Sequence, residues 1–553
     1  MLPSEFNSFS DLFGVPYIFF PVVVSVLTTA IIFLSSTKFL LVAQQTGYSP
    51  RALKTWYDSV GANYKYRLML LSLMSFLAFC LVSSCFIPVT GESAAAFFGF
   101  VPFVLFTAIF IKTERCANVK LPLKKTGRAI RLCVTYCVVL FVTCLLLCFI
   151  ADSIAYLVKN DVVALLRYCV IAFIPMIFPF TIALALAVNK PFEDFRNKRF
   201  VDKARLILKQ SRAVKIGITG SYGKTSVKEL LKHMLSECGS VISTPESYNT
   251  PLGIALTVKD GVDADFFIAE MGAKKQGDVK ELCDIVMPSV GVLTGINFQH
   301  LQTFGCSVAI KKTKFELFES LAGDKTAVFS ADSVGSKELY GRFVGDKYSA
   351  GINGDFVRAE NVVLSEKGSS FDLIIKGEKP VRCETPLLGK HNVSNVCLAA
   401  AVAFKLGASV SNIVCGSAKC YPVPHRLQPI KSECGGIILD DAYNSSEDGA
   451  SAALDVLSEF SGKKIVVTPG LVELGERQEI ANEELGKRIA EVADAVAVTG
   501  KTNVDALKRG LSSKMSESEI IFADTAIDAV QSLGKIKEGE VCLFLNDLPD
   551  SFS

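Results

Sequence analysis

The chain has 553 residues, of which 50% are hydrophobic, and its formal net charge at pH 7 is +3. This length indicates about three or four domains. The hydrophobic share, together with a mean hydropathy of +0.38, exceeds that of an ordinary soluble protein. The near balance of charge gives no reason to expect nucleic acid as a partner.

The 17 cysteines are scattered, without a Cys-x-x-Cys pair and without a histidine at metal-ligand spacing. Cys133 and Cys137, like Cys144 and Cys148, lie four residues apart within one apolar stretch. Free cysteine in such a stretch behaves as a small packing residue. We therefore expect free thiols in a reducing compartment.

Five apolar stretches occupy the first 190 residues. They cover 15–36, 68–88, 94–111, 132–150 and 162–189. Each is near the roughly 20 residues that a helix needs to cross a bilayer. The first stretch lacks the basic start and the cleavage site of a signal peptide. The sequence therefore predicts an N-terminal α-helical membrane domain of about five spans.

The charges between these stretches alternate in sign. The peptide before the first stretch carries Glu5 and Asp11 and no Lys or Arg, and the link between the second and third stretches carries only Glu92. The link after the first stretch, the link between the third and fourth stretches and the segment after residue 190 are rich in Lys and Arg. Because basic segments stay in the cytoplasm, we expect a multi-pass protein of the cell membrane. Its N-terminus would lie outside, and everything after residue 190 would be cytoplasmic.

Residues 216–230 change from an apolar run to Gly-Lys-Thr-Ser and then to a helical pattern. This is typical of a strand, a phosphate-cradling turn and a helix start, where backbone N–H groups and the helix dipole converge on an anion. Lys224 would lie against the β- and γ-phosphates, and the Thr225 hydroxyl would reach a Mg²⁺ ion. The strict Walker spacing is not met, because Ile218 stands where its first glycine belongs. The stretch by itself indicates nucleotide binding without establishing it.

Strands and helices alternate from residue 213 onward, which predicts α/β domains with mainly parallel sheets. Candidate strands cover 214–219, 266–271, 290–294, 437–441, 464–468 and 495–499, and 201–210 reads as a short linker helix. Glu270 ends one buried strand, where a carboxylate needs a cation, so it suits a Mg²⁺ ligand. His300 follows another strand, although a lone histidine is otherwise more often structural. Lys314 lies on a predicted helix with Lys311 and Lys312, for which a solvated face is the alternative interpretation.

A series of short motifs spans about 213–505. It comprises Thr-Gly-Ser-x-Gly-Lys-Thr at 219–225, Ser-Thr-Pro at 243–245, Tyr-Asn-Thr-Pro-Leu-Gly at 248–253, Ala-Glu-Met-Gly-Ala at 269–273, His-Leu-x-x-Phe-Gly at 300–305, Leu-Leu-Gly-Lys-His-Asn-Val-Ser-Asn at 387–395, Pro-Val-Pro-His-Arg-Leu at 422–427, Leu-Asp-Asp-Ala-Tyr-Asn at 439–444 and Pro-Gly-Leu-Val-Glu-Leu-Gly at 469–475. In content and order this series resembles the Mur ligases, the ATP-dependent ligases of peptidoglycan precursors. It is most similar to their MurF branch.

The resemblance implies ATP and Mg²⁺ as cofactors and assigns roles to single positions. ATP-binding residues would be Gly220, Ser221, Gly223, Lys224, Thr225, Ser226, Asn297, Asn395, Arg426 and Asp441. Thr225 would bind one Mg²⁺ ion, Glu270 and His300 would bind a second, and Lys314 would bridge metal ions as a carbamate. The catalytic residues would be Lys224, Lys314 and His300. In this family a substrate carboxylate takes the γ-phosphate of ATP and an amine then displaces phosphate. Such chemistry needs positioning and charge neutralisation more than a protein nucleophile.

The resemblance also implies a domain order. A membrane domain would occupy 1–190, a linker 191–212, a Mur ligase central ATP-binding domain 213–424 and a Rossmann-like C-terminal domain 425–553. The last of these would carry the amine substrate and close onto ATP, which excludes water from the acyl phosphate.

The chain departs from the MurF pattern in three places. Residues 191–212 are too few for the domain that holds the UDP-sugar in soluble MurF enzymes. The motif that begins at Leu439 lacks the usual Asn-Pro, and the last residues lack the usual basic Gly-Ser-Arg-Gly segment. The identity of the acceptor and of the amine therefore stays open.

Three functions remain. The first is a membrane-anchored ligase that joins D-Ala-D-Ala to a muramoyl tripeptide. The second is a Mur-type ligase that acts on a lipid-linked wall precursor or on another carboxylate and amine. The third is a non-catalytic membrane scaffold that keeps a nucleotide-binding module, against which the intact phosphate and metal residues argue.

Overall fold

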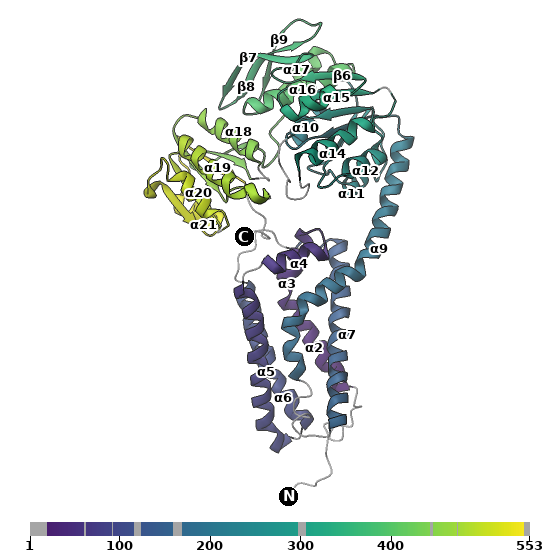
Figure 1. The fold of residues 1–553 in the computed structure, drawn as a ribbon, viewed down its shortest axis with the longest axis vertical. Helices are drawn as coiled ribbons and strands as arrows, with labels where there is room; N and C mark the ends of the chain where they lie inside the picture. The colour runs from purple at the N-terminus through teal and green to yellow at the C-terminus, as the bar shows by residue number, and fades with distance from the viewer. Residues whose placement is uncertain are drawn as a thin grey trace. The chain divides into compact units, whose positions relative to one another are not determined.

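The computed structural model describes residues 19–59, 62–90, 92–115, 123–158, 169–296, 306–323, 325–442, 446–472, 474–500 and 502–546. The chain divides into two compact units between Arg196 and Asn197. The described part of the first unit is helical, and the second unit contains two β-sheets covered by helices (Figure 1).

The first unit is built from apolar helices, several of which run lengthwise beside one another (Figure 1). Its elements are α2 (Phe19–Ser35), α3 (Thr37–Gln45), α4 (Pro50–Ser59), α5 (Ala62–Thr90), α6 (Glu92–Arg115), α7 (Gly127–Val158), the short η1 (Cys169–Phe173) and α9 (Ile174–Gln210), which continues into the second unit. Aromatic rings join these helices inside the unit. The ring of Phe39 lies edge-on to Trp56 at 5.0 Å and to Phe178 at 4.9 Å between centroids.

Helix α7 exposes apolar residues along one side. Its outward side chains recur every fourth residue, and they are Val134, Val138, Val142 and Leu146. Tyr136, Cys144 and Cys148 are fully buried. Contiguous exposed apolar surface of this kind is typical of a face that meets lipid rather than water. The buried Cys144 and Cys148 confirm the prediction of cysteines as packing residues, and every cysteine whose side chain is described is a free thiol.

The described part of the chain contains fewer clear candidate spans than the five that the sequence predicts. Among the described residues, three helical stretches are long and apolar enough to cross a bilayer, namely Lys65–Phe86, Gly127–Ala151 and Ile171–Gln210. A fourth span results if α2 and α3, which are bent by 54° at their junction, count as one. In α6 the described apolar part covers Phe98–Lys112, which is shorter than these three stretches.

Helix α9 is one continuous helix of 37 residues, although Pro179 and Pro191 lie inside it. Residues 201–210, expected as a separate short helix, form its last part. There Ala204 and Leu208 are buried in the core of the second unit. A proline removes one backbone hydrogen bond but does not end a helix whose neighbouring turns are held by packing.

The larger sheet of the second unit has nine strands in the order β2-β3-β1-β4-β5-β6-β7-β8-β9. The strands are β1 (Val214–Thr219), β2 (Val241–Ser243), β3 (Phe266–Glu270), β4 (Val290–Leu293), β5 (Thr326–Ser330), β6 (Asp346–Ala350), β7 (Val357–Ser365), β8 (Gly368–Ile375) and β9 (Val381–Thr385). The first seven in this order pair in parallel, and β7, β8 and β9 form an antiparallel meander.

Helices cover both faces of this sheet. Residues of α10 (Lys224–Ser236), α16 (Lys390–Lys405) and α17 (Val410–Ala418) pack into one core, with Ile216 and Ile218 of β1. Residues of α11 (Pro251–Thr257), α12 (Asp278–Val286), α14 (Ser307–Glu319), α15 (Val334–Arg342) and the end of α9 pack into the other. In such a doubly wound sheet, loops at the carboxyl ends of the parallel strands form the ligand site.

The second sheet has six strands in the order β10-β11-β15-β12-β13-β14, parallel except for β10. Its elements are β10 (Gln428–Lys431), β11 (Ile437–Asp441), α18 (Glu447–Ser458), β12 (Lys463–Thr468), η2 (Gly475–Arg477), α19 (Gln478–Val492), β13 (Ala495–Thr499), α20 (Val504–Leu511), η3 (Glu517–Glu519), β14 (Ile520–Ala523), α21 (Ala526–Leu533) and β15 (Glu540–Leu545). All six strands that the sequence predicts are present, within one residue at each end. The prediction of α/β domains is confirmed.

Candidate active site

The phosphate loop connects β1 to α10. Gly223 precedes the helix at φ 74°, a left-handed conformation that side chains rarely adopt, and a Cβ there would lie 2.8 Å from the side-chain oxygen of Asn395. Lys224, the first residue of α10, donates hydrogen bonds to the carbonyl oxygens of Gly220 at 2.8 Å and Ser221 at 3.4 Å. Burial lowers the pKa of Lys224, an effect that Glu270 opposes and Arg426 reinforces. The loop thus has the shape and the charge of an anion site at a helix N-terminus.

Two oxygen ligands lie side by side next to this loop. The hydroxyl of Thr225 donates a 2.9 Å hydrogen bond to Oε2 of Glu270, whose residue is only 1% exposed. They meet because β1 and β3 are neighbouring parallel strands, with Ile218 paired to Glu270. Hydroxyl and carboxylate oxygens are the hard ligands that Mg²⁺ prefers, and Mg²⁺ completes its octahedron with water and phosphate oxygens. The pair therefore fits a magnesium ion.

Further ligands to this ion are not visible in the described part of the chain. It contains no group of three His, Cys, Asp or Glu side chains that would hold a metal. His300 and Asn297, both expected in this region, lie outside the described residues.

Lys314 points into the site from α14 and is 4% exposed. Burial, followed by repulsion from Lys224, lowers the pKa of Lys314 to about 7, against the attraction of Asp278, Glu316 and Glu270. The amine is therefore substantially neutral at neutral pH, which is the form that reacts with CO₂ to give a carbamate. The alternative that Lys314 belongs to a solvated face is wrong. Lys312 is exposed, and Lys311 forms an ion pair with Glu338 at 2.6 Å.

Two cavities meet at the phosphate loop. One has a volume of about 570 Å³ and is lined by Thr225, Glu270, Asn395, Arg426 and Asp441 among others. The other has a volume of about 610 Å³ and is lined by Lys314, Lys275 and the loop before α11, among others. Ser221, Lys224, Asn249 and Lys274 line both. We call the first the nucleotide cavity and the second the acceptor cavity, after the ligands that we propose for them below.

The walls of the nucleotide cavity come from both sheets. Asn395 of α16 is 6% exposed and donates a 3.0 Å hydrogen bond to Oδ1 of Asn392. Asp441, at the end of β11, accepts a 3.1 Å hydrogen bond from the backbone N–H of Leu427. Burial raises the pKa of Asp441 to about 7, although Arg426 opposes the shift. The charge of the Asp441 carboxyl group therefore depends on its distance from the Arg426 guanidinium.

The structure brings most of the expected site residues together. Those that line one or both cavities are Gly220, Ser221, Gly223, Lys224, Thr225, Ser226, Glu270, Lys314, Asn395, Arg426 and Asp441. Asn249, Asp332 and His391 are among the cavity residues to which the sequence analysis assigned no role. Asn249 contacts Glu270, Asp332 accepts a 2.5 Å hydrogen bond from Ser394, and the pKa of His391 is lowered to about 4 by burial. Asp332 follows β5 directly, so its place at a strand end was the signal that identifies it.

Two family models match the second unit. Residues 218–403 match the Mur ligase middle domain and residues 425–545 match the Mur ligase glutamate ligase domain. The chain is 29% identical over 361 residues to the UDP-N-acetylmuramoyl-tripeptide–D-alanyl-D-alanine ligase of Escherichia coli K12, a match that covers 62% of this chain and 77% of that enzyme. The Mycobacterium tuberculosis H37Rv ligase of the same name is 31% identical over 309 residues, which cover 53% of this chain and 60% of that one.

Solved structures agree with these relatives. The Thermotoga maritima MurF ligase in complex with ADP has a TM-score of 0.57 and 27% identity, and the similarity covers 64% of this chain and 80% of that one. MurF from Acinetobacter baumannii has the same fold, with a TM-score of 0.58, 24% identity and coverage of 64% and 78%. Through the domains at 218–403 and 425–545, the chain belongs to the Mur ligase family of ATP-dependent ligases.

Proposed function

We propose that the chain is a membrane-attached MurF-type ligase, which uses ATP and Mg²⁺ to join the terminal carboxylate of a muramoyl tripeptide to D-Ala-D-Ala. The observation that carries this proposal is the junction of the two cavities. Ser221, Lys224, Asn249 and Lys274 line both, so a γ-phosphate in one cavity would face a carboxylate in the other across the phosphate loop. Holding reactants in this relation supplies much of the catalysis of phosphoryl transfer.

The reaction would run in two displacements. A carboxylate oxygen of the acceptor attacks the γ-phosphorus as the bond to the β,γ-bridging oxygen breaks, which gives an acyl phosphate and ADP. The amine of the second substrate then attacks the acyl carbon, phosphate leaves with the electrons of the C–O bond, and the amine nitrogen loses a proton. Lys224, on the wall between the cavities, neutralises charge on the phosphate that is transferred. A Mg²⁺ ion held by Thr225 and Glu270 would supply further neutralisation.

Lys314 would act on the acceptor side. It lines the acceptor cavity together with Lys224, and its lowered pKa keeps the amine available for carbamylation. Carbamylation replaces a buried cation by an anion, which suits a residue next to a divalent ion. The proposed metal ligands are therefore Thr225, Glu270, His300 and carbamylated Lys314.

The C-terminal domain would complete the nucleotide site. Arg426 and Asp441 line the nucleotide cavity from that domain, and Asn395 lines it from the central one. A site assembled from two domains excludes water once they close, which protects an acyl phosphate from hydrolysis. We assign the central domain to 213–424 and the C-terminal domain to 425–553.

The first unit would anchor the enzyme in the cell membrane. The acidic N-terminal peptide, the Lys- and Arg-rich segments after α3 and α6, and the Lys- and Arg-rich second half of α9 favour an external N-terminus and cytoplasmic catalytic domains. Five spans over 1–190 would satisfy this arrangement, with α2–α3 and α6 as the two additional crossings. Reporters fused after residues 91 and 122 should lie on opposite sides of the membrane. Reporters on the same side would overturn the five-span topology.

A second candidate function is the ligation of a lipid-linked precursor. The observation in its favour is that β1 begins at Val214, only a few residues after α9 ends at Gln210. There is no room between these two elements for a domain that binds a UDP-sugar. In this version the membrane helices would present the acceptor.

One experiment tests both candidates. The full chain, purified in detergent, would be given ATP, Mg²⁺ and D-Ala-D-Ala, and phosphate release would be measured with UDP-muramoyl tripeptide or with its lipid-linked form. Turnover with the UDP-linked form supports the first candidate, and turnover with only the lipid-linked form supports the second. Nucleotide binding without turnover on either acceptor overturns both substrate assignments.

A further inference from the structure

Lys228 is a fully buried cation beside the proposed metal site. It lies on α10, one turn after Thr225, and its exposed fraction is 0%. A lysine is almost never buried to this degree unless its charge is paired. None of the roles assigned above uses this residue.

The ammonium group of Lys228 has three oxygen partners. Its Nζ donates a short hydrogen bond to the backbone carbonyl oxygen of Glu246. It also lies 3.4 Å from Oε1 of Glu229 and 3.9 Å from Oε2 of Glu270. The contact with Glu246 is a hydrogen bond and the two carboxylates are ion-pair partners, so oxygen atoms from three residues surround the ammonium group.

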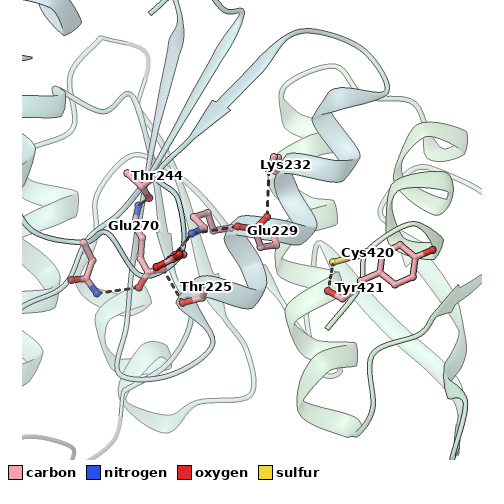
Figure 2. A network of polar contacts seen from close by, with 10 residues as sticks. Thr225, Glu229, Lys232, Thr244, Glu270, Cys420 and Tyr421 are labelled. Atoms are coloured by element: carbon pink, nitrogen blue, oxygen red, sulfur yellow. Dashed lines mark hydrogen bonds and ion pairs between the residues drawn. The ribbon is translucent and has the colours of Figure 1, made fainter. Parts of the chain in front are cut away.

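The Glu246 carbonyl belongs to a loop that is itself built around Glu270. This loop runs from the end of β2 to the start of α11, and Glu246 has φ 45°, which is uncommon for a residue other than glycine. At one end the Thr244 hydroxyl accepts a 3.1 Å hydrogen bond from the backbone N–H of Glu270. At the other end the side-chain amide of Asn249 donates to Oε1 of Glu270 at 3.2 Å. Figure 2 shows Glu270 between Thr225 and Thr244, with Glu229 and Lys232 farther along α10.

We propose that Lys228 is a positioning residue of the metal site, whose buried ammonium fixes the Glu270 carboxylate and the 244–249 loop in the arrangement that receives the ion. The carboxylate has four constraints: Thr225 and Lys228 at Oε2, Asn249 at Oε1 and Thr244 at its backbone. Lys228 also contacts the loop that carries Asn249 and Thr244, through the Glu246 carbonyl oxygen. Its loss therefore removes one constraint on the carboxylate and one on the loop that carries two of the others. Residues that orient a metal ligand without binding the metal themselves typically contribute 10- to 100-fold to metal affinity.

The proposal rests on the proposed magnesium site and is tested by ion binding rather than by turnover alone. The probe is Mn²⁺, which shares the octahedral oxygen preference of Mg²⁺, titrated into the full-length protein with ADP and followed by electron paramagnetic resonance. Lys228→Met, which is similar in length and lacks the charge, should raise the Kd for Mn²⁺ by about 10- to 100-fold. Binding of a fluorescent ADP analogue in EDTA should stay within about threefold of wild type, because the phosphate loop is untouched.

Lys232→Met is the matched control. Lys232 lies one turn farther along the same helix, is partly exposed, and pairs with Glu229 at 3.7 Å. It should bind Mn²⁺ as the wild type does. An equal loss in both variants would mean that helix charge, and not the contact with Glu270, sets the affinity, which would overturn the proposal.

Two further results keep the test decisive. If Lys228→Met does not yield folded protein, Lys228→Gln retains a donor for the Glu246 carbonyl without the charge, and wild-type Mn²⁺ affinity in that folded variant overturns the proposal. Lys228→Arg should recover most of the affinity lost in the methionine variant. Failure of the wild type to bind Mn²⁺ with ADP would instead overturn the proposed metal site itself.

Discussion

The hydroxyl of Thr225, in the first turn of α10, donates a 2.9 Å hydrogen bond to the carboxylate of Glu270 at the end of β3. Both side chains are buried, and both line the nucleotide cavity. Glu270→Gln keeps the size of the side chain and replaces one charged ligand oxygen by an amide. We expect it to lower the rate of phosphate release at least about 100-fold and to raise the Mg²⁺ concentration needed for half-maximal rate. A Mg²⁺ titration of the steady-state rate measures both effects, and an unchanged Mg²⁺ requirement would contradict the assignment.

Lys224→Ala should abolish turnover and leave membrane insertion and folding intact. The side chain lies on the wall shared by both cavities, so its loss removes the charge that faces the transferred phosphate. Phosphate release and carbonate-resistant membrane association are the two measurements. Lys232→Met serves as the control for a general loss of charge on α10. Appreciable ligation by the alanine variant would exclude the phosphate role of Lys224.

Lys314→Met should abolish ligation, without rescue by bicarbonate, and should stabilise the fold at low pH. The folded protein holds the pKa of Lys314 at about 7, whereas the unfolded chain restores it to roughly 10.4. Between these values the unfolded state binds more protons, so the stability of the wild type rises with pH. The gain in melting temperature from Lys314→Met should therefore be largest at or below about pH 7 and should shrink as the pH rises above it. Thermal unfolding at several pH values in CO₂-free buffer measures the gain, and a variant that is active or less stable than wild type at low pH would contradict this account.

Lys275→Glu should weaken binding of the acceptor and leave binding of ATP unchanged. Lys275 is exposed and lines only the acceptor cavity, whereas Lys274 lines both cavities. Reversing its charge should raise the KM for an anionic acceptor by about tenfold, equivalent to roughly 1.4 kcal/mol at a partly screened site. The KM for ATP should change less than twofold. A larger effect on ATP than on the acceptor would show that the two cavities have been assigned the wrong way round.

Arg131→Met should destabilise the first unit. Glu193 is 3% exposed and pairs with Arg131 at 2.5 Å and with Arg196 at 3.0 Å. Removing one partner of a buried ion pair typically costs about 3 kcal/mol, whereas removing both charges costs less. The melting temperature in detergent should fall for the single variant and recover largely in Arg131→Met with Glu193→Leu. Lys198→Met, at an exposed position on α9, should leave it unchanged.

The position of Lys228 shows a limit of sequence reasoning at this site. On a helix that begins with Lys224 and continues with Glu229 and Lys232, a further lysine reads as part of a solvated face. Its burial is a consequence of the 244–249 loop folding over that part of α10, which brings the Glu246 carbonyl to its ammonium group. Contacts between segments this far apart in sequence are set by tertiary packing and leave no local pattern.

The sequence by itself determined the elements that carry the site. Apolar runs of strand length followed by polar residues predict both the strands and the edge at which they end, because parallel strands present their carboxyl ends together. Thr225 and Glu270 lie together near this edge of the sheet. The apolar stretches and the Lys- and Arg-rich links likewise predict a membrane region without reference to its packing.

Only the tertiary structure decided how buried and how charged these groups are. The helix pattern leaves Lys314 as easily on a solvated face as in the site, and the choice follows from the packing of α14 against the sheet, which desolvates the amine next to Lys224. The bend between α2 and α3, the continuity of α9 and the β7–β9 meander likewise depend on neighbours distant in sequence. Local sequence fixes hydrogen-bonding patterns within an element, whereas desolvation and charge pairing depend on what packs around it, and these set the chemistry of this site.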